Sequence, residues 1–198
     1  MSEHSSLDKT AVTAAPVLPV IAERWSPRSY DASHTISATE ITSLLEAARW
    51  APSANNLQPW RFSVIKREDA LFADLIQHGL KGWNQAWAPN ASAIIIVSAV
   101  VADNDGKQNA YAAFDSGLAT QNLLLEATHL GLAAHVLGGI VPEWLDEALG
   151  LDGNIQPLVG ITVGKRAPAD ELDGPLHDRE VAPRTRLSLD EIVLHGKP

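Results

Sequence analysis

The sequence predicts a single α/β domain in which a β-sheet is covered by helices on both sides. Three observations support this prediction. Ala93–Val101 is a largely apolar run without alternation, rich in β-branched residues, as expected for a strand buried on both faces. Ser37–Glu40 has the pattern of a helix capping box, and apolar residues recur behind it at helical spacing. Strand and helix patterns then alternate along the chain, so the class is a mixed α/β or α+β sheet.

The first half of the chain predicts four elements after a polar start. Residues 1–15 are expected to form a polar N-terminal tail, and residues 16–198 a single domain. The expected elements are one or two helical turns in Pro16–Arg24, a helix around Ile41–Ala48 that ends before Pro52, a strand at Arg61–Lys66 and a helix over Glu68–Leu80.

The second half contains the longest predicted helix, Asn109–Leu130, which is apolar almost all round. Such a helix must be buried, either by its own domain or by a partner chain. Gly117 within it predicts the close approach of another backbone. Strands are expected at Ala133–Leu137 and Leu158–Val163, with a helix at Pro142–Leu149 between them. From Lys165 onward the chain is polar and rich in proline, which favours a tail that wraps across a surface.

Composition excludes several classes of protein. The 198 residues contain no cysteine, so disulfides, zinc clusters built from thiolates and thiol nucleophiles are excluded. The net charge of −9 argues against nucleic acids and anionic membranes as partners, because affinity for both comes from Lys and Arg. No apolar run is long enough to span a membrane, and the first 15 residues lack the apolar region of a signal peptide. We therefore expect a cytoplasmic protein.

Known catalytic motifs are missing. The seven histidines form no metal-binding motif, so no metal site is predicted. The sequence also lacks a serine nucleophile elbow and the glycine-rich cradles that bind dinucleotides or nucleoside triphosphates. Consequently no side chain is expected to act as a catalyst.

Two basic clusters and one polar loop remain as candidate binding features. Arg24-Trp25-Ser26-Pro27-Arg28 and Arg184-Thr185-Arg186 place guanidinium groups where they could hold a phosphate monoester, although solvated arginines paired with surface acids give the same pattern. The segment 51–60 is rich in Pro, Ser and Asn and offers donors for the polar edge of a flat heterocycle, or else a structural turn closed by Trp60.

Together these segments resemble the nitroreductase family of FMN-dependent oxidoreductases. The resemblance covers about residues 20–196, nearly the whole chain. The segments that carry it are Arg24-x-Ser26-x-Arg28, Ala-Pro-Ser-x-x-Asn-x-Gln-Pro-Trp at 51–60, Asn84-Gln85-Ala86-Trp87, Asp115-Ser116-Gly117, Gly131–Gly139, Val159–Gly164 and Arg186-x-x-Leu189-x-Glu191-Ile192-Val193.

The resemblance implies a mixed sheet flanked by helices, an intertwined homodimer with a C-terminal arm, and FMN bound at the dimer interface. In relatives, one set of positions holds the phosphate and ribityl chain, a loop from the partner subunit approaches the flavin, and a third set lies beside the ring. The matching residues here are Arg24, Trp25, Ser26, Arg28, Arg184 and Arg186; then Pro52, Ser53, Ala54 and Asn56; then Asn84, Leu137, Gly138 and Gly139.

The implied function is transfer of a hydride from NAD(P)H through FMN to a nitroaromatic or quinone acceptor by a ping-pong mechanism. The flavin carries the chemistry, and the protein orients it and tunes its charge. Alternatives are a flavin-dependent dehalogenase, a flavin-consuming relative, or a non-catalytic dimer that stores or senses FMN. Trp83, Trp87, Tyr111 and Phe114 are candidate pocket walls, with plain core residues as the alternative reading.

Overall fold

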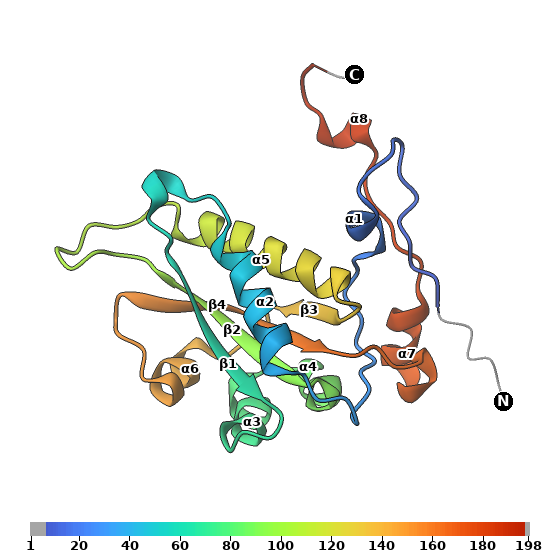
Figure 1. The fold of residues 1–198 in the computed structure, drawn as a ribbon, viewed down its shortest axis with the longest axis horizontal. Helices are drawn as coiled ribbons and strands as arrows, with labels where there is room; N and C mark the ends of the chain where they lie inside the picture. Colours follow the sequence, from blue (N-terminus) through green and yellow to red (C-terminus); the bar gives the residue numbers. More distant parts are fainter. Residues whose placement is uncertain (1–6, 197–198) are drawn as a thin grey trace.

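Four strands form one sheet at the centre of the protein (Figure 1). The computed structural model describes residues 7–196 of the chain. The strands lie in the order β1 (Trp60–Lys66), β2 (Ala93–Val100), β4 (Ile155–Gly164) and β3 (Ala133–Leu137). The predicted α/β class is confirmed, and the three pairings between these strands are all antiparallel.

Helices cover both faces of this sheet (Figure 1). Two of them, α2 (Ala38–Arg49) and α5 (Ala112–His129), lie across one face. The opposite face is covered by α3 (Leu71–Asp74), α4 (Asn84–Trp87) and α6 (Pro142–Leu149). The remaining helical segments are α1 (Pro19–Glu23), η1 (Ala54–Asn56), η2 (Leu75–Gly79), η3 (Ala88–Asn90), η4 (Ala169–Glu171), α7 (Gly174–Val181) and α8 (Leu189–Ile192).

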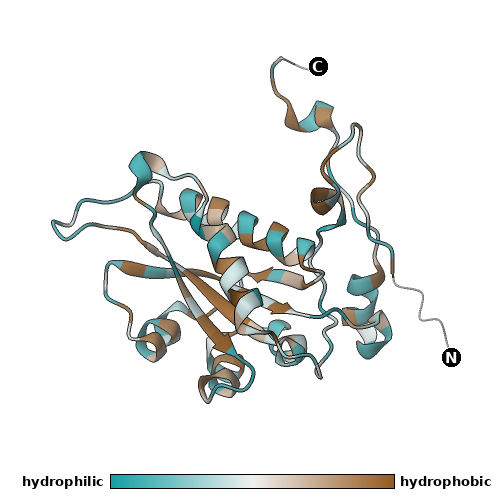
Figure 2. Ribbon diagram, viewed as in Figure 1, coloured by the Kyte–Doolittle hydropathy of each residue, from teal (hydrophilic) through white to brown (hydrophobic). Residues whose placement is uncertain are grey.

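The central strand β2 has both of its faces buried, as its apolar, non-alternating sequence predicts. Side chains of a strand point alternately to opposite faces. Accordingly, Ile95 and Val97 belong to the core beneath α2 and α5, while Ile94 and Ile96 belong to the core with α4 and α6. Figure 2 shows these central strands as the most apolar part of the chain.

The predicted capping box at the start of α2 is confirmed. The Glu40 amide donates to Ser37 Oγ, and the Ser37 amide donates to the Glu40 carboxylate at 2.8 Å. Leu44 and Ala48 then face the core at helical spacing, so the same residues that predict the helix also anchor it.

Three local expectations differ from the structure in detail. The helix expected over 68–80 is present but shorter, because α3 continues without a break into η2, where the helix geometry changes from α to π. The polar segment after Lys165 contains a helix, α7, that the sequence did not predict. Gly117 has no atom of the described residues within 4 Å of the position that a side chain would take, so the close approach predicted there does not come from this part of the same chain.

One face of α5 is exposed although its sequence is apolar. Phe114 is 66% exposed and Tyr111, just before the helix, is 59% exposed. Of the four candidate pocket walls, only Trp87 is a core residue, because Trp83 is also exposed. Within a single chain, α5 therefore keeps an uncovered apolar face.

The N-terminal and C-terminal segments run side by side (Figure 1). The Lys9 ammonium donates to the carbonyl of Ala182, and Arg184 donates back to the carbonyl of Lys9. The Ala11 amide donates to Ala22 O at 2.9 Å, which joins the same segment to α1. None of the helices in the described part of the chain is long and apolar enough to cross a bilayer.

Candidate functional site

The loop that follows α1 presents two arginines and a serine, as predicted. Arg24 closes α1, and its guanidinium lies 3.4 Å from Ser26 Oγ. Arg28 is half-buried, and its side chain makes no hydrogen bond or ion pair with another described residue. Trp25 lies beside them, with Lys9 Nζ over its ring at 5.2 Å. We call residues 24–29 the arginine loop.

Two buried groups hold the backbone of the arginine loop. Glu180, on α7, accepts hydrogen bonds from the Arg28 amide at 2.9 Å and the Ser29 amide at 3.3 Å. His135, on β3, lies 2.9 Å from the carbonyl of Pro27, so its Nδ1–H is the donor. Elements far apart in the sequence thus fix one short loop.

The side chains around the arginine loop form a positively charged cluster. Burial lowers the pKa of Arg24, and the charges of Arg184 and Arg186 lower it further. Burial and the charge of Arg186 also lower the pKa of Arg184. Arg184 donates to the carbonyls of Lys9 and Ala22, while Arg186 is exposed. No described carboxylate forms an ion pair with any of the three, so an anion placed here would relieve their mutual repulsion.

The end of β3 lies against α4. Leu137 is buried and ends the strand, while Gly138 is exposed with open space on its side-chain side. A side chain at Gly139 would meet Asn84 Nδ2 at 2.7 Å and Lys81 O at 3.3 Å. Asn84 Nδ2 in turn donates to Gly139 O at 3.5 Å. The pair of glycines therefore permits a close approach of α4 on one side and leaves bare backbone on the other.

A stacked pair on the surface links this corner to the arginine loop. Arg179, on α7, lies over the ring of Trp83 with its Cζ 5.0 Å from the ring centroid. The positive charge of Arg179 also lowers the pKa of Arg28. Arg179 of α7 thus contacts Trp83 beside Asn84 and lies near enough to Arg28 for their charges to interact.

The polar loop at 52–56 lies near the N-terminal end of α5, away from the arginine loop (Figure 1). The Ala54 amide donates to Oδ2 of the buried Asp115 at 3.0 Å, which ties this loop to the first turn of α5. The Gln58 amide donates to Ser53 Oγ at 3.0 Å, while Pro52 and Asn56 are exposed. Asn56 has a left-handed φ of 56°, a conformation that asparagine tolerates better than most residues. Within one chain, the 52–56 loop therefore lies apart from the arginine loop, at the other end of α5 (Figure 1).

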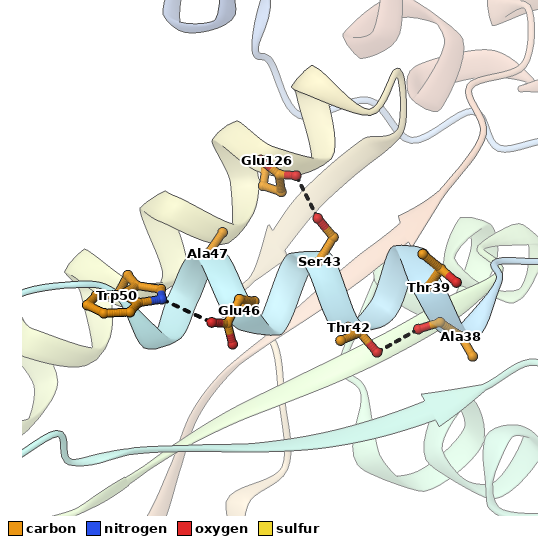
Figure 3. A pocket seen from close by; sticks show the side chains of 8 residues that line it. All are labelled: Ala38, Thr39, Thr42, Ser43, Glu46, Ala47, Trp50 and Glu126. Carbon is orange, nitrogen blue, oxygen red and sulfur yellow. Dashed lines mark hydrogen bonds between the residues drawn. The ribbon is translucent and has the colours of Figure 1, made fainter.

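A shallow groove of about 600 Å³ lies between α2 and α5 (Figure 3). Trp50, which is 72% exposed, closes one end and donates from Nε1 to Glu46 at 3.0 Å. Ser43 Oγ donates to Glu126 at 2.7 Å across the groove. None of the predicted cofactor residues lines it. The groove instead extends the exposed face of α5.

Sequence patterns did not reveal the groups that support the site. Glu180 and His135 belong to no motif, and their partners are backbone atoms of a distant segment. Asp115 lies in a segment that carries the family resemblance, but its bond to the Ala54 amide needs the structure. Local signals for these roles are absent, because any residue supplies a backbone amide or carbonyl.

Comparisons with known proteins identify the family of the chain. The profile of the Nitroreductase family matches residues 21–91 and 73–165. The chain is 35% identical over 169 residues to an Archaeoglobus fulgidus protein named "Putative NADH dehydrogenase/NAD(P)H nitroreductase", covering 79% of this chain and 87% of that one.

Two solved structures share the fold over almost their whole length. A crystal structure described as an oxidoreductase containing FMN has a TM-score of 0.87 at 33% identity and covers 93% of this chain and 94% of its own. A Desulfovibrio desulfuricans protein solved in complex with FMN has a TM-score of 0.73 at 31% identity, covering 93% and 98%.

Proposed function

This chain belongs to the nitroreductase family, and from that membership we propose that it is an FMN-dependent NAD(P)H oxidoreductase. In this proposal a hydride from NAD(P)H reaches an electron-poor acceptor of the nitroaromatic or quinone type. NAD(P)H binds, reduces the flavin and leaves before the acceptor binds at the same site, which is a ping-pong mechanism. Because NAD(P)H is a cytoplasmic metabolite, the proposal also places the protein in the cytoplasm.

The cluster of unpaired arginines is the observation that carries the proposal. Arg24, Arg28 and Arg186 form no ion pair with a carboxylate among the described residues, in a protein whose net charge is −9. A phosphate monoester carries nearly two negative charges at neutral pH and accepts several hydrogen bonds. The residues present therefore fit the phosphate end of FMN.

The predicted residues divide the contacts with FMN between them. Arg24, Ser26, Arg28, Arg184 and Arg186 would hold the phosphate and ribityl chain, with Trp25 beside them. The open backbone at Leu137–Gly139 and the Asn84 amide would lie along the ring. Bound FMN would supply the reversible two-electron chemistry. No side chain of the protein is assigned the role of acid or base.

We further propose that the protein is a homodimer in which the loop at 52–56 of one copy completes the site of the other. Within one chain this loop and the arginine loop lie at opposite ends of α5 (Figure 1). The exposed Phe114 and Trp50 and the groove between α2 and α5 give a second copy an apolar face to cover.

The first experiment is a visible absorption spectrum of the purified protein, followed by anaerobic addition of NADH and then NADPH. We expect flavin bands that one of the two nicotinamides bleaches and that a quinone restores. Bands that persist under both donors would favour storage or sensing of FMN. A protein that shows no flavin bands even after addition of FMN would contradict the cofactor assignment and every site residue named with it.

A further inference from the structure

Glu180 is a buried carboxylate in the middle of a cationic site. Its side chain is 1% exposed, on a face of α7 turned toward the arginine loop. The groups that face it carry positive charge, since Arg28 and Lys9 both lower its pKa while burial raises it. An acid in such a place would ordinarily neutralise an arginine and compete with any anionic ligand.

The bonds of Glu180 avoid this competition. Its two oxygens accept the amides of Arg28 and Ser29, at 2.9 and 3.3 Å, and it takes part in no ion pair within residues 7–196. The Arg28 guanidinium therefore keeps its donors free. The carboxylate fixes where the side chain of Arg28 begins; its negative charge stabilises the Arg28 guanidinium at a distance but occupies none of its N–H donors.

Other bonds hold the same loop in register. Ser29 Oγ donates to Pro168 O at 2.6 Å, and His135 donates to Pro27 O. The neighbour of Glu180 on α7, Arg179, lies over Trp83 at the Asn84–Gly139 corner. Two successive residues of α7 thus contact the two regions that one chain would contribute to the proposed FMN site: Glu180 binds the arginine loop, and Arg179 lies over Trp83 beside the Asn84–Gly139 corner.

We propose that Glu180 is a positioning residue that aims the arginine loop at the phosphate of the cofactor by binding two of its backbone amides. The inference rests on the proposed function, because it takes FMN to be the ligand. Its action is geometric: the bonds to Arg28 N and Ser29 N set the direction of the loop, although the charge of Glu180 repels the phosphate.

Geometry and charge predict opposite results for the variant Glu180→Gln. The amide oxygen of Gln can accept one of the two backbone N–H groups, but its NH₂ then faces the other, donor against donor. Loss of that bond is expected to weaken FMN binding about tenfold. If the charge of Glu180 were its main effect, removing it would strengthen FMN binding instead.

The test measures dissociation constants for FMN and for riboflavin, which lacks the phosphate. The variants are Glu180→Gln and, as a matched control, Asp178→Asn, which makes the same charge change at an exposed position of the same helix. We expect Glu180→Gln to bind FMN more weakly and riboflavin as the wild type does, and Asp178→Asn to bind both as the wild type does. Glu180→Asp keeps the charge but is too short to reach both amides, so it should show the same loss and carries the test if Glu180→Gln does not fold.

Three results would overturn the inference: tighter FMN binding, no change, or an equal loss for FMN and riboflavin, which would indicate only a weakened fold. Failure of the proposed function looks different, because the wild-type protein itself would then bind no FMN.

Discussion

At the scale of single residues, His135 shows how a side chain near the site is kept uncharged. Burial lowers its pKa to about 4, and the positive charges of Arg28 and Arg24 act in the same direction. The bonds it donates to the backbone of Pro27 and Ser26 oppose this shift only in part. At neutral pH a neutral imidazole therefore holds the arginine loop and adds no further repulsion to the cationic cluster.

The lowered pKa predicts a dependence of stability on pH. Between pH 6.5 and pH 4 the unfolded chain binds a proton at His135 that the folded protein does not, so stability is present above that window and is lost as the pH falls through it. His135→Asn keeps a donor near Pro27 O and cannot be charged. From pH 7 to pH 5 we expect the wild type to lose about 2 kcal/mol more than this variant.

Urea unfolding at both pH values measures this difference. His129→Asn, which replaces an exposed histidine at the end of α5, should behave like the wild type. Equal losses in the wild type and in His135→Asn would show that His135 is not held neutral.

The residue scale also shows what the sequence could predict. Arg24, Ser26 and Arg28 were predicted because their chemical types and spacing are distinctive within five positions. Glu180 acts 152 positions away from the Arg28 amide that it binds. No local pattern encodes such a contact, since its partner is a peptide group.

At the scale of elements, α2 was predicted most completely, because its signals are all local. Its capping box should contribute measurably to stability. Replacing Ser37 by Ala removes the side-chain acceptor for the Glu40 amide and is expected to lower the free energy of unfolding by about 1 kcal/mol.

Chemical denaturation of Ser37→Ala tests this, with Thr39→Ala as the control. Thr39 is an exposed residue of the same turn whose side chain makes no recorded hydrogen bond within the described chain. The control should stay within about 0.5 kcal/mol of the wild type. A similar small change in Ser37→Ala would mean that solvent replaces the cap at no cost.

The helix α7 was not predicted, for a physical reason. Its most buried side chain is a glutamate, and Leu176 is only half-buried. Hydrophobic periodicity detects helices that turn apolar residues inward. A helix that is anchored through a carboxylate and two backbone amides leaves no such signal.

At the scale of the whole molecule, the proposed homodimer predicts that FMN binding depends on the pairing of two chains. If each site combines the arginine loop of one chain with the 52–56 loop of another, defects in different loops should complement each other. Arg28→Met and Pro52→Glu should each abolish tight FMN binding as homodimers. After unfolding and refolding of an equimolar mixture, about a quarter of the sites should be intact, because half of the dimers are mixed and each holds one unaltered site.

The recovery is measured as FMN bound per chain. A mixture of Arg28→Met and Arg24→Met, whose defects lie in the same loop, should recover nothing. Recovery in neither mixture would contradict the shared site, while sedimentation would still report whether the chains pair.

The structure of α5 also limits how this chain can change over generations. Asp115 in its first turn anchors the 52–56 loop, and its last turn leads through Gly131 straight into β3 and the Leu137–Gly139 backbone. Adding or deleting one residue would rotate one end against the other by about 100° and shift it by about 1.5 Å. The length of α5 is therefore constrained. In related sequences we expect insertions and deletions to occur in the turn at residues 103–107 and not in α5.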